Sequence, residues 1–74
     1  MTKLPSISGR ECVRALEKAG VYMSRQTGSH MNLRRDDPYG KVVVPSHREL
    51  DRGTLRRVIR QAGLTVEEFV ALLK

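Results

Sequence analysis

The spacing of the apolar residues changes twice along this 74-residue chain, and these changes constrain the fold more than any other feature. From residue 8 to residue 19 the apolar side chains recur every three or four residues, as on one face of a helix. Between residues 21 and 45 they alternate with polar side chains, as in strands, and after residue 52 the helical spacing returns. The pattern predicts one helix, three strands and two further helices.

Capping signals place the ends of the three helices. The residues positioned as N-caps are Ser8, Asp51 and Thr65. The first and last of these are followed three residues later by a glutamate, which is the spacing of a capping box. Gly20 and Gly63 follow the first two apolar stripes and are placed to end a helix in a left-handed turn. We expect helices over about residues 8–19, 52–62 and 65–73.

Turn-forming residues separate three short runs that alternate like strands. We expect these strands at about residues 21–26, 30–35 and 41–44, with Pro45 ending the last. Met31 and Leu33 mark the inner face of the middle strand. One face of the resulting meander is expected to pack on helices, and the other to meet solvent. The predicted fold is α+β, a three-stranded antiparallel sheet with helices on one face, in a single domain over residues 1–74.

The charge of the chain points to a polyanionic partner. Fourteen lysines and arginines stand against 8 acidic residues, which gives a net charge of +6. Such an excess favours nucleic acid, although a merely soluble basic protein is the alternative. Ten of the cations are arginines, and a guanidinium group can contact two phosphate oxygens at once. Because so short a chain builds only a thin core, we expect the function on its surface.

Several classes of function lack support in the sequence. Cys12 is the only cysteine, so neither an internal disulfide nor a paired-cysteine zinc site is expected. There is no P-loop, GxGxxG, HExxH or acidic metal-binding cluster, so we expect no metal and no cofactor. Three aromatic residues are too few for a base-stacking sheet of the RRM kind. No apolar run has the length of a signal peptide or membrane span, which predicts a cytoplasmic protein without a membrane partner.

His30 is the first candidate for chemistry. It follows Gly28-Ser29 at the start of the second strand, and by alternation it should point to the solvent side of the sheet. Gly28 allows a positive φ in the turn and close approach of a ligand. Histidine exchanges protons near neutral pH, which suits general acid–base catalysis. The alternative is an exposed histidine without a role.

The other histidine and three arginines extend this candidate site. His47 lies in the loop before the second helix, where it could bind phosphate or transfer a proton, although a structural role in capping a strand end is favoured. Arg25, Arg34 and Arg35 are expected to bring positive charge near His30, where a cleaving enzyme must stabilise a phosphorane dianion.

Arginines also line the second predicted helix. Arg52, Arg56 and Arg60 are spaced four residues apart on one face, and no acidic residue occurs between Arg52 and Val66. Like charges at this spacing cost a few tenths of a kcal/mol per pair. RNA phosphates or an acidic protein would offset that cost, and a solvated arginine face is an equal alternative.

Taken together, these segments resemble the HicA family of bacterial toxin–antitoxin systems. The similarity covers about residues 6–72. The matching segments are, in chain order, Gly28-Ser29-His30, Val42-Val43-Val44-Pro45 with His47, Glu49-Leu50, Gly53-Thr54-Leu55, residues 59–64 and Glu67-Glu68-Phe69. No single motif is strong, but their order and spacing together are specific.

The resemblance implies a fold like that of the double-stranded-RNA-binding domain. It also implies ribosome-independent cleavage of mRNA with His30 essential, and a HicB-like antitoxin that binds and inhibits the chain. RNA contacts are then expected from Ser29 beside the catalytic residue, from His47 and from the arginines named above. The chemistry would be metal-free transesterification through a ribose 2′-hydroxyl. The alternatives are a non-catalytic basic RNA-binding module and a purely structural adaptor.

Overall fold

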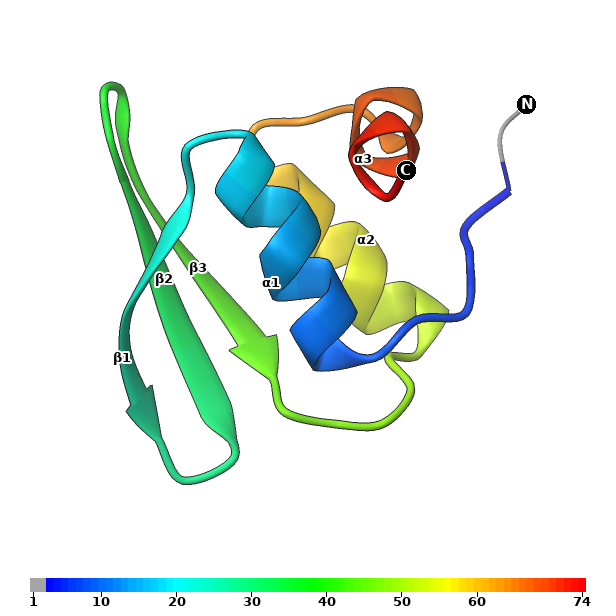
Figure 1. Ribbon diagram of the computed structural model, residues 1–74, viewed down its shortest axis with the longest axis horizontal. Coiled ribbons are helices and arrows are strands. Elements are labelled where there is room, and N and C mark those ends of the chain that lie inside the picture. The colour runs from blue at the N-terminus through cyan, green and yellow to red at the C-terminus, as the bar shows by residue number, and fades with distance from the viewer. Residues whose placement is uncertain (1–2) are drawn as a thin grey trace.

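The computed structural model describes residues 3–74, and its helices and strands follow the predicted order (Figure 1). The elements are α1 (Gly9–Lys18), β1 (Tyr22–Thr27), β2 (His30–Asp36), β3 (Tyr39–Pro45), α2 (Arg52–Gln61) and α3 (Val66–Leu72). The α+β class and the αβββαα order are therefore confirmed. β3 begins at Tyr39 rather than Lys41, because Tyr39 and Gly40 still pair with the end of β2.

The N-caps are those that the sequence predicts. Ser8 and Thr65 each accept a hydrogen bond from the backbone of a glutamate three residues later, and both capping boxes are complete. The Asp51 carboxylate accepts from the backbone N–H of Thr54 at 2.7 Å. Gly20 and Gly63, the residues predicted to end helices, have φ values of 84° and 76°. Local sequence signals thus define the helix ends.

The sheet is an antiparallel meander in the order β1-β2-β3, with β2 in the centre. A two-residue loop, Gly28-Ser29, joins β1 to β2, and Gly28 has a φ of 59°. Glycine at the first of two loop positions is typical of type II′ hairpin turns. The register of β1 shifts by one residue between Met23 and Arg25, so that Ser24 forms an irregularity at this edge.

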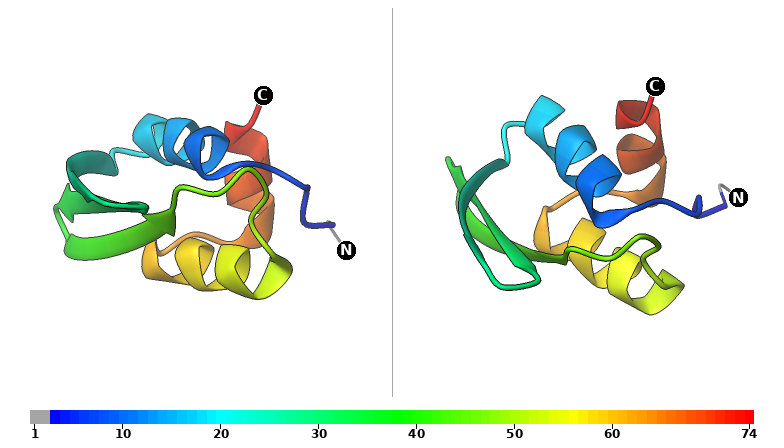
Figure 2. Two further views of the ribbon diagram at one scale, coloured as in Figure 1. Left: turned by 90° about the horizontal axis from the view of Figure 1, so that it is seen from below. Right: turned by 60° about the horizontal axis from the view of Figure 1, so that its bottom comes forward.

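The helices lie on one side of the sheet. Helices α1 and α2 pack against it, and α3 packs against α1 and α2 on the side away from the sheet (Figure 2). No element within residues 3–74 covers the opposite side of the sheet, which we call the open face. Within residues 3–74, no helix is long and apolar enough to cross a membrane.

One cluster of buried apolar side chains fills the space between the sheet and the helices. Its largest fully buried members are Phe69, Leu16, Leu33, Leu55, Val21, Val42, Val44, Val58 and Cys12. Met31 and Leu33 belong to this cluster, as predicted. Met23 pairs with the buried Leu33 but is itself 37% exposed, because β1 is an edge strand whose residues are all exposed. No polar or charged side chain is buried among residues 3–74.

Candidate functional site

His30 begins β2 and lies on the open face. It is exposed, whereas the next residue, Met31, is 3% exposed and packs under the helices. Its cross-strand neighbours are Thr27 on β1 and Pro45 on β3. The Ser46 N–H donates a 2.6 Å hydrogen bond to the Ser29 carbonyl oxygen, which ties the loop before His30 to the end of β3. His30 therefore stands at one end of the open face, as the alternation predicts.

The loop after β3 brings His47 to the same end of the sheet. The Gly9 N–H, at the start of α1, donates a 2.9 Å hydrogen bond to the His47 carbonyl oxygen. A Cβ at Gly9 would overlap the Pro45 carbonyl oxygen, so glycine allows α1 to approach β3 this closely. These contacts hold the backbone of His47 in place and leave its side chain exposed.

The strand register defines which side chains share the open face. From the His30 end, successive cross-strand rows on this face are Thr27/His30/Pro45, Arg25/Asn32/Val43, Tyr22/Arg34/Lys41 and Asp36/Tyr39. Neighbouring rows are two residues apart, which is about 7 Å along a strand. Of the three arginines expected near His30, Arg25 lies in the adjacent row. Arg34 lies two rows away, at about 13 Å along the strand.

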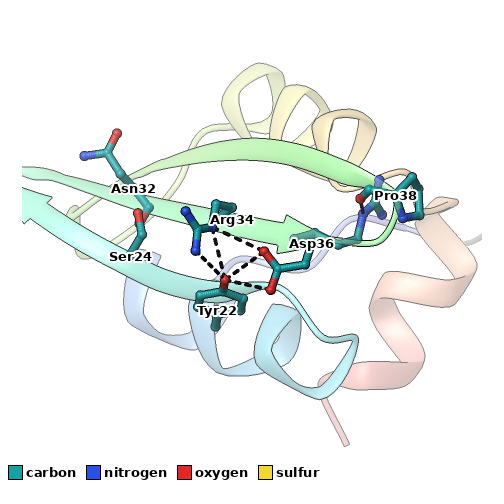
Figure 3. Close-up of polar contacts among 7 residues, drawn as sticks. Tyr22, Ser24, Asn32, Arg34, Asp36 and Pro38 are labelled. Carbon is teal, nitrogen blue, oxygen red and sulfur yellow. Dashed lines mark hydrogen bonds and ion pairs between the residues drawn. The ribbon is translucent and has the colours of Figure 1, made fainter.

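Arg34 is held in a polar cluster at the far end of the open face (Figure 3). Its Nε and Nη2 donate to the Tyr22 hydroxyl at 3.1 and 2.9 Å. That hydroxyl donates in turn to the Asp36 carboxylate at 2.9–3.0 Å, and Arg34 Nε lies 3.4 Å from Asp36 Oδ1. The hydrogen bond with Tyr22, together with the nearby Asp36 carboxylate, raises the pKa of Arg34. Asp36 thus balances this positive charge locally.

Arg35 points to the opposite side of the sheet. Its Nη1 donates to the Ala62 carbonyl oxygen at the end of α2, at 2.5 Å, and its Nε donates to the Pro38 carbonyl oxygen at 2.9 Å. The side chain therefore links the β2–β3 hairpin to α2. The expectation that Arg34 and Arg35 lie near His30 is wrong. Arg34 lies two rows away from His30 along β2, and Arg35 points to the opposite side of the sheet.

A shallow groove of about 560 Å³ runs along the open face. The side chains of the open face that line it are Arg25, Thr27, Asn32, Arg34, Tyr39, Lys41 and Val43. Sequence reasoning did not select Tyr39 or Lys41. Their positions alternate with the buried Val42 and Val44, so the period of two that predicts β3 was the signal that could have found them.

The α2 arginines lie away from this face. Arg56 and Arg60 are exposed and line a separate hollow of about 280 Å³ with Leu64 and Val66, beside the start of α3. On another flank of α2, Gln61 accepts a 3.4 Å hydrogen bond from the Val43 N–H at the edge of β3. The exposed Arg52, at the start of the arginine stripe, lines a different hollow with Leu4 and Ser6. The groove on the open face is lined by none of the three stripe arginines.

No group of three or more histidine, cysteine, aspartate or glutamate side chains within residues 3–74 is arranged to hold a metal ion. A family model described as the HicA toxin of bacterial toxin–antitoxin systems matches residues 9–64. The chain belongs to the HicA toxin family. The match to the HicA model runs from α1 to just beyond α2, so it includes His30, His47 and the whole sheet. No curated protein matches the chain.

Membership of the HicA family makes this protein the toxin of a toxin–antitoxin system, with a cognate antitoxin as its partner. The fold agrees with the one that the resemblance implies, a three-stranded sheet with helices on one side.

Proposed function

We propose that this HicA toxin is a metal-independent endoribonuclease that cleaves mRNA in the cytoplasm, with His30 as its catalytic residue. The observation that carries the proposal is the location of His30 on an uncovered and basic sheet face. Its side chain is exposed there, and Arg25 lies in the next row. A phosphodiester can therefore approach the imidazole without any opening of the fold.

In the proposed reaction, His30 removes the proton from a ribose 2′-hydroxyl. The resulting oxyanion attacks the neighbouring phosphorus, and the bond from phosphorus to the 5′-oxygen breaks as the new bond forms. The leaving oxygen takes a proton, from protonated His30, from His47 or from water. The products are a 2′,3′-cyclic phosphate and a 5′-hydroxyl. A single histidine acting in this way supplies about 10²–10⁴-fold, so this toxin is expected to be a modest nuclease.

Three of the RNA contacts expected from the sequence support this arrangement. The loop residue Ser29 precedes His30, the exposed His47 lies at the same sheet end, and Arg25 can stabilise negative charge that develops on the phosphate. Arg34 is balanced by Asp36, Arg35 is engaged on the other side of the sheet, and the stripe Arg52, Arg56 and Arg60 lies on α2. These arginines are not part of the proposed catalytic site.

The antitoxin has a simple physical route to inhibition. An acidic protein surface laid on the open face would cover His30 and neutralise positive charge at the same time. We propose a HicB-like antitoxin of this kind as the inhibiting partner. It needs to reach only the exposed end of the sheet that carries the two histidines.

A non-catalytic RNA-binding module is the second candidate function. The groove on the open face and the net charge of +6 favour it, because both suit the binding of a polyanion without any chemistry. The two candidates differ in the effect of His30→Ala. In a nuclease this variant loses turnover and keeps RNA binding, whereas in a binding module it only weakens binding modestly.

A substrate with one ribonucleotide in an otherwise DNA strand tests the mechanism directly. The 2′-hydroxyl is the proposed nucleophile, so cleavage should occur only on the 3′ side of that ribonucleotide and should leave a cyclic phosphate. The matched all-DNA strand should remain intact. Equal cleavage of the two strands would refute the transesterification mechanism.

A further inference from the structure

The open face carries two cations whose charge is not balanced by an acidic neighbour. Arg25 lies on β1 and Lys41 on β3, so they stand at the two edges of the groove with Asn32 between them on β2. Within residues 3–74 the one ion pair is that between Arg34 and Asp36. Arg25 and Lys41 are thus available to contact anions, and they lie in adjacent rows of the sheet, about 7 Å apart along the strand direction.

An exposed aromatic ring closes the end of the groove opposite His30. Tyr39 is 62% exposed, against 36% for Tyr22, whose hydroxyl is held by Arg34 and Asp36. The row that contains Tyr39 is six residues from the row of His30 along β2, or roughly 20 Å. This span is much longer than one nucleotide. This face still differs from an RRM-like sheet, because the ring of its other tyrosine, Tyr22, lies beneath the guanidinium group of Arg34.

The combination of charge and aromatic surface favours single-stranded RNA over an acidic peptide or a duplex. Cations that follow a groove and an aromatic ring that accepts a base are the two elements of single-strand binding. A duplex keeps its bases stacked inside, where Tyr39 could not reach their faces. An acidic peptide would use Arg25 and Lys41 but would gain little from the exposed ring.

We propose that single-stranded RNA lies along the open face, with its phosphates on Arg25 and Lys41 and an unpaired base stacked on Tyr39. The base on Tyr39 then lies several nucleotides from the phosphodiester at His30. This path deepens the proposed function, because it specifies that the substrate is single-stranded RNA. It rests on that function only for the position of the cleaved phosphodiester at His30.

Binding of a ten-nucleotide 2′-O-methyl RNA tests the path without cleavage, because the proposed nucleophile is blocked. Its Kd is measured by fluorescence anisotropy at several salt concentrations, for the wild type and for exposed-residue variants. Each phosphate contact on a single strand contributes about 0.7 to the slope of log Kd against log salt. Arg25→Ala and Lys41→Ala should each lower this slope by about 0.7. Arg14→Ala, which removes an exposed charge from α1, should leave the slope unchanged.

Tyr39 has a different signature in the same experiment. Tyr39→Leu removes the aromatic face but keeps apolar bulk, and should weaken binding by about tenfold with no change in the salt slope. Tyr39→Phe keeps the ring and should bind like the wild type. In cleavage assays, Tyr39→Leu should raise KM for a ten-nucleotide RNA but not for a dinucleotide, which is too short to reach from His30 to Tyr39.

The outcomes separate this path from the proposed catalysis. If the variants change 2′-O-methyl RNA binding as described and unmodified RNA is never cut, the path stands and the nuclease proposal fails. If RNA is cut while Arg25, Lys41 and Tyr39 variants bind like Arg14→Ala, the path is overturned. It is also overturned if these variants lose affinity only for an acidic polypeptide such as polyglutamate.

Discussion

Arg25 and Arg35 carry the same charge on the same sheet, yet their surroundings give them different roles. Arg25 is exposed on the open face beside the row of His30. Arg35 is half-buried and donates hydrogen bonds to the carbonyl oxygens of Ala62 and Pro38. A substitution should therefore affect RNA binding at the first position and stability at the second.

Urea denaturation of the two alanine variants tests this contrast. Arg35→Ala should lower the free energy of unfolding by about 2 kcal/mol, since it removes charge-assisted hydrogen bonds between the hairpin and α2. Arg25→Ala should change it by less than about 0.5 kcal/mol, as is usual for exposed positions. A stable Arg35→Ala variant with weakened RNA binding would mean that Arg35 reaches the substrate after all.

Cys12 provides a residue-level probe of unfolding. Its side chain is fully buried in α1, and burial raises the pKa of the thiol to about 12. Because the thiolate is the reactive form, the folded protein should resist a thiol reagent at pH 8. Labelling should become fast in denaturant, and its rate in water should report how often the core opens. Rapid labelling of the native chain would contradict the packing of α1.

At the scale of elements, the approach of α1 to the end of β3 depends on a glycine. A Cβ at Gly9 would overlap the Pro45 carbonyl oxygen and lie 3.1 Å from Met31 Cε. We expect Gly9→Ala to destabilise the fold by about 1–3 kcal/mol, because the backbone of β3 must move. Urea denaturation measures this effect: the midpoint should fall while the m-value stays the same.

Gly53 in α2 is the matched control for this effect. A Cβ there would meet only Asp51 Oδ1, at an ordinary contact distance of 3.5 Å. Gly53→Ala should therefore stabilise the protein by about 0.5 kcal/mol, owing to the better helix propensity of alanine. If both substitutions stabilise the protein equally, the contact of Gly9 with β3 is not as tight as described.

The elements show which features of this chain could be predicted from its sequence. Helix caps were predictable because a cap is made by residues three positions apart, and Ser8, Asp51 and Thr65 all act as expected. The side of the sheet on which His30 lies was predictable from simple alternation. These are local properties, which neighbouring residues determine.

The composition of the site was less predictable because it depends on pairing between strands. Arg34 and Arg35 are close to His30 in sequence, but the first lies two rows away and the second faces α2. Alternation with the buried Val42 and Val44 indicates the face on which Lys41 and Tyr39 lie, but the β2–β3 register is needed to show which residues of β2 they lie beside. Likewise, the packing of α2 against β3 and α3 determines which side of α2 faces solvent, and the spacing of the arginines alone does not predict it.

For the whole molecule, two helix caps make stability depend on pH. Hydrogen bonds from the Thr54 backbone N–H and hydroxyl lower the pKa of Asp51, and those with Ser8 lower the pKa of Glu11. Both carboxylates have a lower pKa in the folded state than in the unfolded chain. Their contribution is therefore present above an ordinary value of about 4 and is lost as the pH falls through the folded-state value.

Urea midpoints at pH 6 and pH 3 check this dependence. We expect the wild type to lose stability on acidification. Asp51→Asn should lose less between the two pH values, since asparagine caps a helix well without titrating. If the loss is identical in the two proteins, protonation of the Asp51 cap does not contribute to the acid sensitivity of the fold.

Catalysis by a single exposed histidine on a basic face is the central claim about the whole molecule. The most direct test is cleavage of a labelled single-stranded RNA in EDTA by wild type, His30→Ala and His47→Ala, with the folding of each variant checked by circular dichroism. We expect cyclic-phosphate products from the wild type, no cleavage by His30→Ala, and at least residual cleavage by His47→Ala. Equal cleavage by wild type and His30→Ala, or none by either, would contradict catalysis by His30.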